Sequence, residues 1–355
     1  MFVTHAHNFL LQSYDVPIWG REAVAVFFVL SGFVISYVGG SKEADWRAYA
    51  TARLARVLPV CVLALIITAL LDTVGVKFDP GHYAALQRQF QFYVPVSWGA
   101  VAADLSFTNQ LWHTHVIYGT DEPYWSLGFE VQYYLVFGFL LFVRPLWAKT
   151  LLILIWCVFV GPKILMYLPL WLMGVAALKL VTSGRFPRGI GPAIAFNAVA
   201  IGVAYAADVY LGARAISMYL SYGLVTELFN FGYFNAIGLA VALHLLGMAA
   251  LVGLLPAVPE RIGHGIRWLA GASFTIYLIH QPLLVFLSMF QGSPGNAVGG
   301  AALAIVAILC CLGLAELAER RKKMFAGLFG AVLRMTGDPM RTRPARLPIA
   351  PRPTP

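Results

Sequence analysis

Ionisable side chains that lie within apolar sequence are the residues of this chain best suited to chemistry. His5, Glu130 and His280 each fall within an apolar run or at its end. In a bilayer such a side chain is costly unless it has a partner or a function. The imidazole of His5 titrates near neutral pH, which suits a general base that removes a proton from an attacking hydroxyl group. The alternative for His5 is a histidine at the membrane interface near the start of the chain.

Polar and aromatic residues accompany Glu130 at helical spacing. Trp125 and Ser126 come just before it, and Tyr134 follows one turn later on the same face. A buried carboxylate needs a partner, and it could orient a histidine or bind an acceptor hydroxyl. Alternatively, the aromatic residues form a belt at the membrane surface and Glu130 points to water.

His280 lies in the middle of an apolar run, one turn after Tyr277 and directly before Gln281 and Pro282. Because Pro282 removes a backbone hydrogen bond, we expect a kink near this histidine. Substrate binding and helix packing are both open as roles for His280.

Two arginines lie three residues apart, directly before the apolar run 58–74. Arg53 and Arg56 therefore share one face of a predicted helix. Their guanidinium groups could hold the phosphates of a ligand on the cytoplasmic side. The alternative is an ordinary positive anchor at the inner end of a membrane helix.

The other histidines and the cysteines give no indication of a metal or redox site. His113 and His115 have no third ligand at suitable spacing, so we predict no metal site, and we expect His244 to be a packing residue. The cysteines lie inside apolar runs, without metal or disulfide spacing, and are expected to be core residues: Cys61, Cys157, Cys310 and Cys311.

The composition places the chain in a bilayer. Of its 355 residues 60% are hydrophobic and 12% are charged, and the mean hydropathy is +0.75. Soluble domains carry about 25% charged residues, so we predict an all-α polytopic membrane protein. The net charge of +9 falls in short clusters between apolar runs, as the positive-inside rule expects, and does not indicate a nucleic-acid partner. Residues 1–11 lack the basic flank and cleavage site of a signal peptide.

We predict about ten transmembrane helices, the first of them apparently incomplete at its N-terminus. Segment 1–11 is too short to span a membrane alone; it is either an interfacial helix or, as we favour, the end of a first span. The fifth span is short, with a break expected around Gly161 and Pro162. The complete spans are expected at 23–37, 58–74, 126–143, 151–160, 165–181, 190–207, 231–254, 269–290 and 297–314.

Two connections and the C-terminus are predicted outside these spans. The polar stretch 76–124 is expected to be a structured or re-entrant loop on the outer side, and 211–229 an outer loop or interfacial helix. With the N-terminus inside, the Lys and Arg clusters all fall on one face, which makes the end of the chain cytoplasmic. We therefore divide the chain into a membrane domain, 1–318, and a basic, Pro/Arg-rich, partly disordered tail, 319–355.

Ser31 and Gly32 lie in the middle of the apolar run 24–38. A glycine here lets a neighbouring helix approach closely, and a serine hydrogen-bonds to a carbonyl or a partner helix. The bland interpretation is one packed helix among many.

Four strings, in order along most of the chain, resemble the membrane acyltransferase-3 family, whose members transfer acyl groups to sugars. They are FFVLSGFVISY at 27–37, RLARVLP at 53–59, EPYWSLGFEVQYYLVF at 122–137 and ASFTIYLIHQPLLVF at 272–286. The family also has an arginine, ten residues and then a histidine in its first helix. His5 matches that histidine best, with His7 as second choice. The matching arginine would precede Met1, which indicates a start assigned too late or a degenerate member, and we favour the late start.

The resemblance implies an O-acyltransferase of the bacterial inner membrane, with a cytoplasmic tail and no bound cofactor. It would transfer an acyl group, acetyl in particular, from acyl-CoA to a hydroxyl of a cell-surface or exported saccharide or glycolipid. His5 would act as general base with help from Glu130, and Arg53 and Arg56 would hold the donor. The remaining residues expected to shape the site are Trp125, Ser126, Tyr134, Tyr277 and His280.

Two other functions are weighed against this one. A saccharide transporter or flippase could use the same polar groups as a pathway, although no internal repeat is visible. An inactive scaffold of a polysaccharide-synthesis machine is the third hypothesis, because the family's arginine is missing. Release of CoA with formation of an ester would distinguish the enzyme from both.

Overall fold

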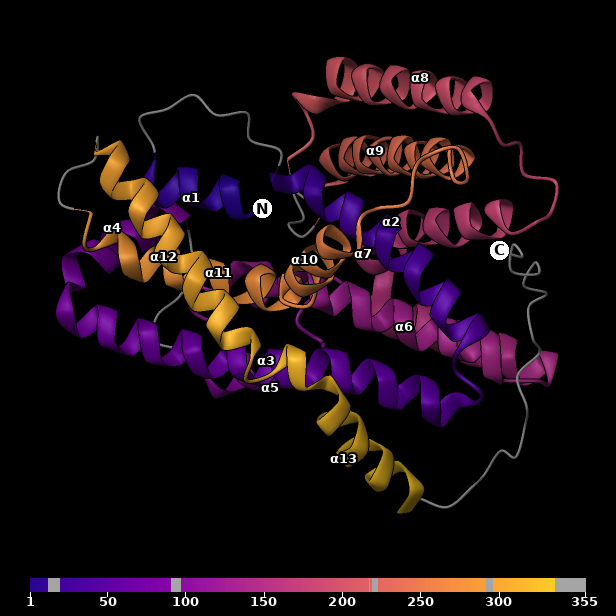
Figure 1. Ribbon diagram of the computed structural model, residues 1–355. Helices are drawn as coiled ribbons and strands as arrows, with labels where there is room; N and C mark the ends of the chain where they lie inside the picture. Colours follow the sequence, from indigo (N-terminus) through magenta and orange to yellow (C-terminus); the bar gives the residue numbers. More distant parts are fainter. Residues whose placement is uncertain (12–19, 91–96, 217, 219–222, 292–295, 336–355) are drawn as a thin grey trace.

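The computed structural model describes residues 1–11, 20–90, 97–216, 218, 223–291 and 296–335, and it confirms an all-α protein (Figure 1). Within these ranges the only extended pairing is an isolated bridge between Tyr118 and Asp121. The α-helices are α1 (Phe2–Leu10), α2 (Gly20–Ser41), α3 (Trp46–Phe78), α4 (Pro80–Phe90), α5 (Trp98–Leu105), α6 (Leu127–Phe142), α7 (Leu146–Val181), α8 (Ile190–Ala207), α9 (Leu224–Ala250), α10 (Glu260–Ala270), α11 (Ser273–Ser288), α12 (Ala297–Ala315) and α13 (Lys322–Met335).

Seven helices of the described chain are long and apolar enough to cross a membrane, or eight if the bent pair α10 and α11 forms one span. The protein is therefore a multi-pass membrane protein, as predicted. The spans expected at 151–160 and 165–181 belong to one long helix, α7, and α1 has only 9 residues. The predicted number of about ten is reached only by counting α7 as two segments and α1 as a partial span.

The helix α7 is broken at Gly161, as the Gly-Pro step predicts. Gly161 has φ +77°, a conformation that favours glycine, and a Cβ atom there would lie 2.7 Å from Cγ of Trp112. The polar loop packs over this break, because the backbone N–H of Trp112 donates to the carbonyl of Val160 at 2.9 Å. Lys163 adds a second tie by donating to Oε1 of Gln110 at 3.0 Å. The predicted structured loop is thus confirmed, and it is docked on α7.

Helices α2 and α7 approach each other to backbone contact. A Cβ atom on Gly32 would lie 1.9 Å from the carbonyl oxygen of Trp171, and one on Gly174 would lie 1.9 Å from that of Val29. Only glycine permits such an approach. The close packing predicted for the Ser31–Gly32 step is therefore present, and its partner is α7.

Buried carboxylates lie where the polar loop meets the end of α3. Asp72 accepts hydrogen bonds from the hydroxyl of Thr120 at 2.7 Å and from its backbone N–H at 2.9 Å. Asp104 and Asp121 are fully buried beside it. Burial raises the pKa of Asp104 to about 8, and burial together with the charge of Asp104 raises the pKa of Asp121 well above its usual range. The polar loop therefore packs around buried aspartates, and two of them, Asp104 and Asp121, favour their neutral form.

Three boundaries differ from the sequence predictions. α11 continues through Pro282, and the chain bends by 50° earlier, between α10 and α11. The span expected at 231–254 is α9, which begins at Leu224 and ends at Ala250. A π-helical turn at Asp208–Gly212 follows α8 and precedes α9 in the chain. Part of the segment 211–229 lies outside the described residues.

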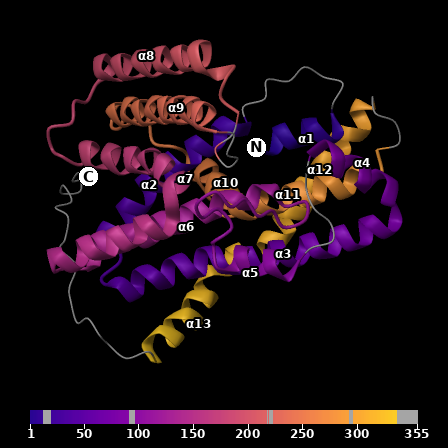
Figure 2. The same cartoon turned by 180° about the vertical axis from the view of Figure 1, so that it is seen from behind.

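The peripheral helices lie on opposite sides of the bundle. α8 and α9 lie side by side at one edge in both views (Figures 1 and 2). At the other edge, α13 packs against α3. The first part of the predicted tail is therefore helical, and residues 336–355 lie outside the described residues.

Candidate active site

The carboxylate of Glu130 is the centre of a hydrogen-bonded cluster between α2, α6 and α7. Glu130 is 2% exposed. It accepts hydrogen bonds from the hydroxyl of Ser31 at 2.9 Å and from the hydroxyl of Tyr134. Nε1 of Trp171 donates to the oxygen of Ser31 at 3.3 Å. Glu130 and Ser31 were each expected to need a polar partner, and they are hydrogen-bonded to each other. Tyr134 shares the helix face of Glu130, as expected.

Arg53 lies beside this cluster and is itself paired. It is 9% exposed and forms an ion pair with Glu43, in the turn between α2 and α3. Its guanidinium carbon lies 5.0 Å from the ring centroid of Tyr49 and 5.8 Å from that of Tyr134. Burial raises the pKa of Glu43, and the charge of Arg53 lowers it in part. Arg53 thus joins α3 to α2 and α6.

Arg56 has an exposed side chain, although it lies one turn after Arg53 on the same helix. Its positive charge interacts with Glu130 and Tyr134. The predicted shared face is confirmed to this extent, because both arginine charges act on Glu130. Of the two arginines, Arg56 is the more exposed residue.

His5 and His280 lie against each other, although 275 residues separate them in the chain. Their ring centroids are 5.0 Å apart at an interplanar angle of 34°. Nδ1 of His280 lies 2.8 Å from the carbonyl oxygens of Ile276 and Tyr277. A carbonyl only accepts, so Nδ1 carries the proton and Nε2 is an acceptor in the neutral ring.

Both rings of this pair retain unused nitrogen atoms. Nδ1 of His5 and Nε2 of His280 are buried and have no hydrogen-bond partner within the described chain. Buried polar atoms are normally paired, and an exception calls for a functional explanation. The two histidines can therefore take up a proton or accept a hydroxyl group from a substrate.

A polar contact joins the histidine pair to the Glu130 cluster. The hydroxyl of Tyr277, one turn before His280, lies 2.7 Å from Oγ of Ser126. Ser126 in turn lies one turn before Glu130, and Tyr277 stacks on Phe27 with 5.6 Å between centroids. His5 and Glu130 are not in direct contact; they belong to two clusters that share this connection.

A cavity of about 130 Å³ opens beside His5. Its polar and aromatic lining includes Thr4, His5, Arg21, Glu122 and Trp125. The ring of Trp125 packs edge-on against Phe129, at 5.4 Å between centroids, which fixes its orientation. A substrate group in this cavity would therefore lie next to the predicted general base.

A larger cavity of about 370 Å³ lies between α3 and α6. Arg53 and Tyr134 are on its wall, and the rest of the lining is almost entirely apolar, including Tyr49, Leu135 and Phe139. Its lining holds no histidine, carboxylate or lysine that could act as a general base near neutral pH. We therefore assign the chemistry to the smaller, polar cavity.

The other histidines and the cysteines match their sequence predictions only in part. His244 is exposed rather than packed, but it pairs with Asn197 at 2.7 Å, and His115 pairs with Gln110 at 3.0 Å. Burial lowers the pKa of His115 to about 4. Within the described residues no group of histidine, cysteine and carboxylate side chains could hold a metal ion. All four cysteines are free thiols, but only Cys61 and Cys311 are core residues as predicted. Cys157 is half-buried and Cys310 is exposed, because neighbouring residues of a helix point to different sides and only some of them face the core.

Sequence reasoning missed several residues of the site. Trp171 has no local signal, because its contact with Ser31 depends on how α7 crosses α2. Glu43 could be suspected only as an acid in the short turn before two arginines. Arg21 and Glu122 line the His5 cavity and lie at the ends of apolar runs, where charged residues are ordinary.

A family model described as an acyltransferase domain matches residues 1–316. The chain therefore belongs to the acyltransferase-3 family, and it is a membrane acyltransferase that transfers groups other than aminoacyl groups. The matched region contains both clusters, from His5 to His280. No curated protein and no solved structure matches the chain.

Proposed function

We propose that the protein is an O-acyltransferase that moves an acyl group, acetyl in particular, from acyl-CoA to a hydroxyl of a cell-surface or exported saccharide. The observation that carries this proposal is the His5–His280 pair, which has unpartnered nitrogens next to a polar cavity. A general base at this position, inside an acyltransferase domain, needs a hydroxyl group to deprotonate.

In the proposed reaction, His5 takes the proton of the acceptor hydroxyl as its oxygen attacks the carbonyl carbon of the thioester. The carbon–sulfur bond breaks, an ester forms, and CoA leaves with the proton that His5 has taken. The fixed Nδ1–H of His280 leaves Nε2 free to accept a hydrogen bond from His5 or from the substrate. The surrounding apolar helices exclude water, which limits hydrolysis of the thioester.

The Glu130 cluster supports the donor side of this reaction. Arg56, exposed and electrostatically coupled to Glu130, is proposed to bind the phosphates of acyl-CoA. Arg53, already paired with Glu43, is proposed to fix the position of α3 at this site. Ser126 and Tyr277 connect this cluster to the histidine pair.

We place the protein in the bacterial inner membrane, with its C-terminal tail in the cytoplasm. This orientation puts Arg56 on the side where acyl-CoA is made, since the arginine clusters between spans then face the cytoplasm. The acceptor is a saccharide or glycolipid under construction, and the polysaccharide-synthesis machinery is the proposed partner. No bound cofactor is needed, because acyl-CoA is the donor.

The test measures ester groups on surface glycans by mass spectrometry in parent, deletion, His5→Ala and His7→Ala strains. We expect one acyl mass to disappear in the deletion strain and to fall by at least about 100-fold with His5→Ala, the size of a lost general base. His7→Ala is the matched control and should retain the esters.

Two results would contradict the proposal. Intact esters in the deletion strain, with less glycan exported, would favour a transporter or flippase. If the esters are lost in the deletion strain but retained in the His5→Ala strain, the protein is still an acyltransferase, but His5 is not its general base. Release of free CoA by the purified chain excludes a scaffold.

A further inference from the structure

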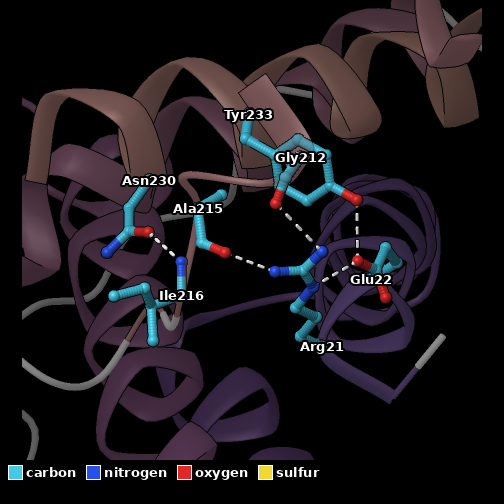
Figure 3. A network of polar contacts seen from close by, with 7 residues as sticks. All are labelled: Arg21, Glu22, Gly212, Ala215, Ile216, Asn230 and Tyr233. Atoms are coloured by element: carbon cyan, nitrogen blue, oxygen red, sulfur yellow. Dashed lines mark hydrogen bonds and ion pairs between the residues drawn. The ribbon is translucent and has the colours of Figure 1, made fainter. Parts of the chain in front are cut away.

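A network of polar contacts at the start of α2 holds the connection between α8 and α9 (Figure 3). The guanidinium of Arg21 donates to the carbonyl oxygens of Ala215 and Gly212, the latter at 3.3 Å. Its Nε atom donates to Glu22 at 2.7 Å. Glu22 also accepts from the hydroxyl of Tyr233 on α9 at 2.7 Å, so the network includes three elements far apart in the chain.

The same connection is tied to α9 from its other side. The side-chain oxygen of Asn230 accepts from the backbone N–H of Ile216 at 2.7 Å (Figure 3). Ala215 is consequently buried, at 3% exposure, whereas Ile216 is 51% exposed. Backbone groups of residues 212–216 are thus held by side chains from α2 and α9.

This connection is a wall of the His5 cavity. Ile216 and Arg21 line the cavity together with Glu122, Trp125 and His5. The position of the wall therefore depends on the two carbonyl contacts of Arg21. Without them, the stretch 212–215 would lose two hydrogen bonds to α2.

The chemistry of the lining fits a sugar. A guanidinium, a carboxylate that accepts from Gln281 at 3.4 Å, and an indole ring surround the cavity beside the histidine pair. Charged groups of both signs bind hydroxyls, and the aromatic ring provides an apolar surface for a sugar ring. The donor side lies elsewhere: Glu43 and Arg53 follow the far end of α2, a helix of 22 residues and therefore about 30 Å long.

We infer that this cavity is the acceptor subsite and that Arg21 is the positioning residue that sets its wall. The inference rests on the proposed function for the identity of the acceptor as a saccharide. The contact between Arg21 and the 212–216 connection is independent of that function. The two parts are therefore tested separately.

The first experiment measures CoA release by the purified full-length protein in detergent. The acceptor probe is total envelope glycan extracted from the deletion strain, and acetyl-CoA is the donor. We expect Arg21→Gln to raise the apparent KM for glycan at least fivefold. The KM for acetyl-CoA should change by less than twofold and kcat at saturating glycan by less than threefold.

Two further variants test the geometry of the contact. Arg21→Lys keeps the charge but has fewer donors, so its KM for glycan should be intermediate. Arg214→Gln is the matched control: Arg214 is exposed on the same connection, with its guanidinium carbon 4.9 Å from the ring centroid of Phe229. This control should leave both KM values unchanged.

The second experiment measures how accessible residue 215 in the cavity wall is, and it does not require an active protein. Ala215→Cys is labelled with a membrane-impermeant maleimide on intact cells, in a Cys310→Ala background. Labelling should be slow with Arg21 present, because residue 215 is buried, and at least tenfold faster in the Arg21→Gln double variant. Arg214→Gln in the same background should leave the rate low.

The outcomes separate the two claims. If the parent protein releases no CoA with the glycan, the proposed function and the acceptor subsite are both wrong. If the parent is active but Arg21→Gln raises the KM for acetyl-CoA instead of glycan, the acceptor subsite alone is wrong. If the labelling rate does not change, Arg21 does not position the wall.

Discussion

At the scale of single residues, Arg53 and Arg56 show how one helical turn changes what a side chain can do. Arg53 is enclosed by two tyrosine rings and paired with Glu43, whereas Arg56 is exposed. Removing one partner of a buried ion pair leaves an uncompensated charge, which costs about 3–5 kcal/mol. Loss of an exposed charge has little effect on stability. The two arginines should therefore separate binding from folding.

We expect Arg56→Gln to raise the KM for acyl-CoA by about tenfold or more, the loss of one charge-assisted hydrogen bond. Its thermal midpoint in detergent should stay within about 2 °C of the parent. Arg53→Gln should instead lower the midpoint by at least about 6 °C, from the cost of leaving Glu43 unpaired. Adding Glu43→Gln should restore part of that loss. Equal midpoints for Arg53→Gln and Arg56→Gln would contradict the assignment.

Residue types and spacing predicted much of the site at this scale. His5, Glu130 and His280 are identifiable because ionisable residues in apolar runs are rare. The contact between His5 and His280 could not be predicted, because it depends on the packing of α1 against α11. Likewise, the shared face of Arg53 and Arg56 follows from helical spacing, but the pairing of Arg53 depends on the turn that carries Glu43.

At the scale of elements, the crossing of α2 and α7 supports the Glu130 cluster. Ser31, which donates to Glu130, is the neighbour of Gly32, and the carbonyl of Trp171 lies against that glycine. A displacement of α7 would therefore also remove the indole that donates to Ser31. Packing and site geometry are coupled at this crossing.

Gly32→Ala should lower the free energy of unfolding by at least about 2 kcal/mol, since the new Cβ would overlap a backbone oxygen that cannot rotate away. Activity should fall along with stability. Gly202→Ala is the control: this glycine lies in α8 with no neighbour within 4 Å, so alanine should be neutral or stabilise by up to about 1 kcal/mol. Thermal unfolding in detergent measures both, and equal midpoints for the two variants would contradict the prediction.

The elements differ in how well sequence predicts their breaks. The break at Gly161 was predictable, because a Gly-Pro step both permits and forces a non-helical residue. The 50° bend before Ser273 was not, since Gly271 alone is a weak signal. Pro282 misled the prediction, because a helix packed on several sides tolerates a proline.

At the scale of the whole molecule, the polar loop packs at the end of α3 around Asp72, Asp104 and Asp121. The folded state favours the protonated form of Asp104, because burial raises its pKa to about 8. In the unfolded chain an aspartate loses its proton near pH 4. The corresponding stability is fully present below about pH 4 and is lost as the pH rises through 8.

The thermal midpoint of the parent should therefore fall between pH 5 and pH 9. Asp104→Asn keeps the shape of the side chain without the charge, so its midpoint should fall less over the same range, by a difference of at least about 2 °C. Scanning calorimetry or dye-based unfolding in detergent measures the difference. Parallel curves for the two proteins would show that Asp104 does not titrate in this range.

The molecular architecture was predictable in outline, because hydropathy identifies most of the spans. The number of spans was less secure, since the two spans predicted on either side of Gly161 form one long helix that is broken at this residue. The docking of α13 on α3 could not be predicted: its basic composition resembles that of the tail that follows it. Long-range packing, rather than local pattern, decides such cases.

The order of the helices along the chain also bears on how the protein is made. Synthesis proceeds from the N-terminus, so α2 and α3 are already present when α6 emerges. Ser31, Arg53 and Arg56 therefore await Glu130 when its carboxylate enters the bilayer. Chain order thus supplies partners from two earlier helices when Glu130 is inserted, whereas the reverse order would leave it with Tyr134 of its own helix alone.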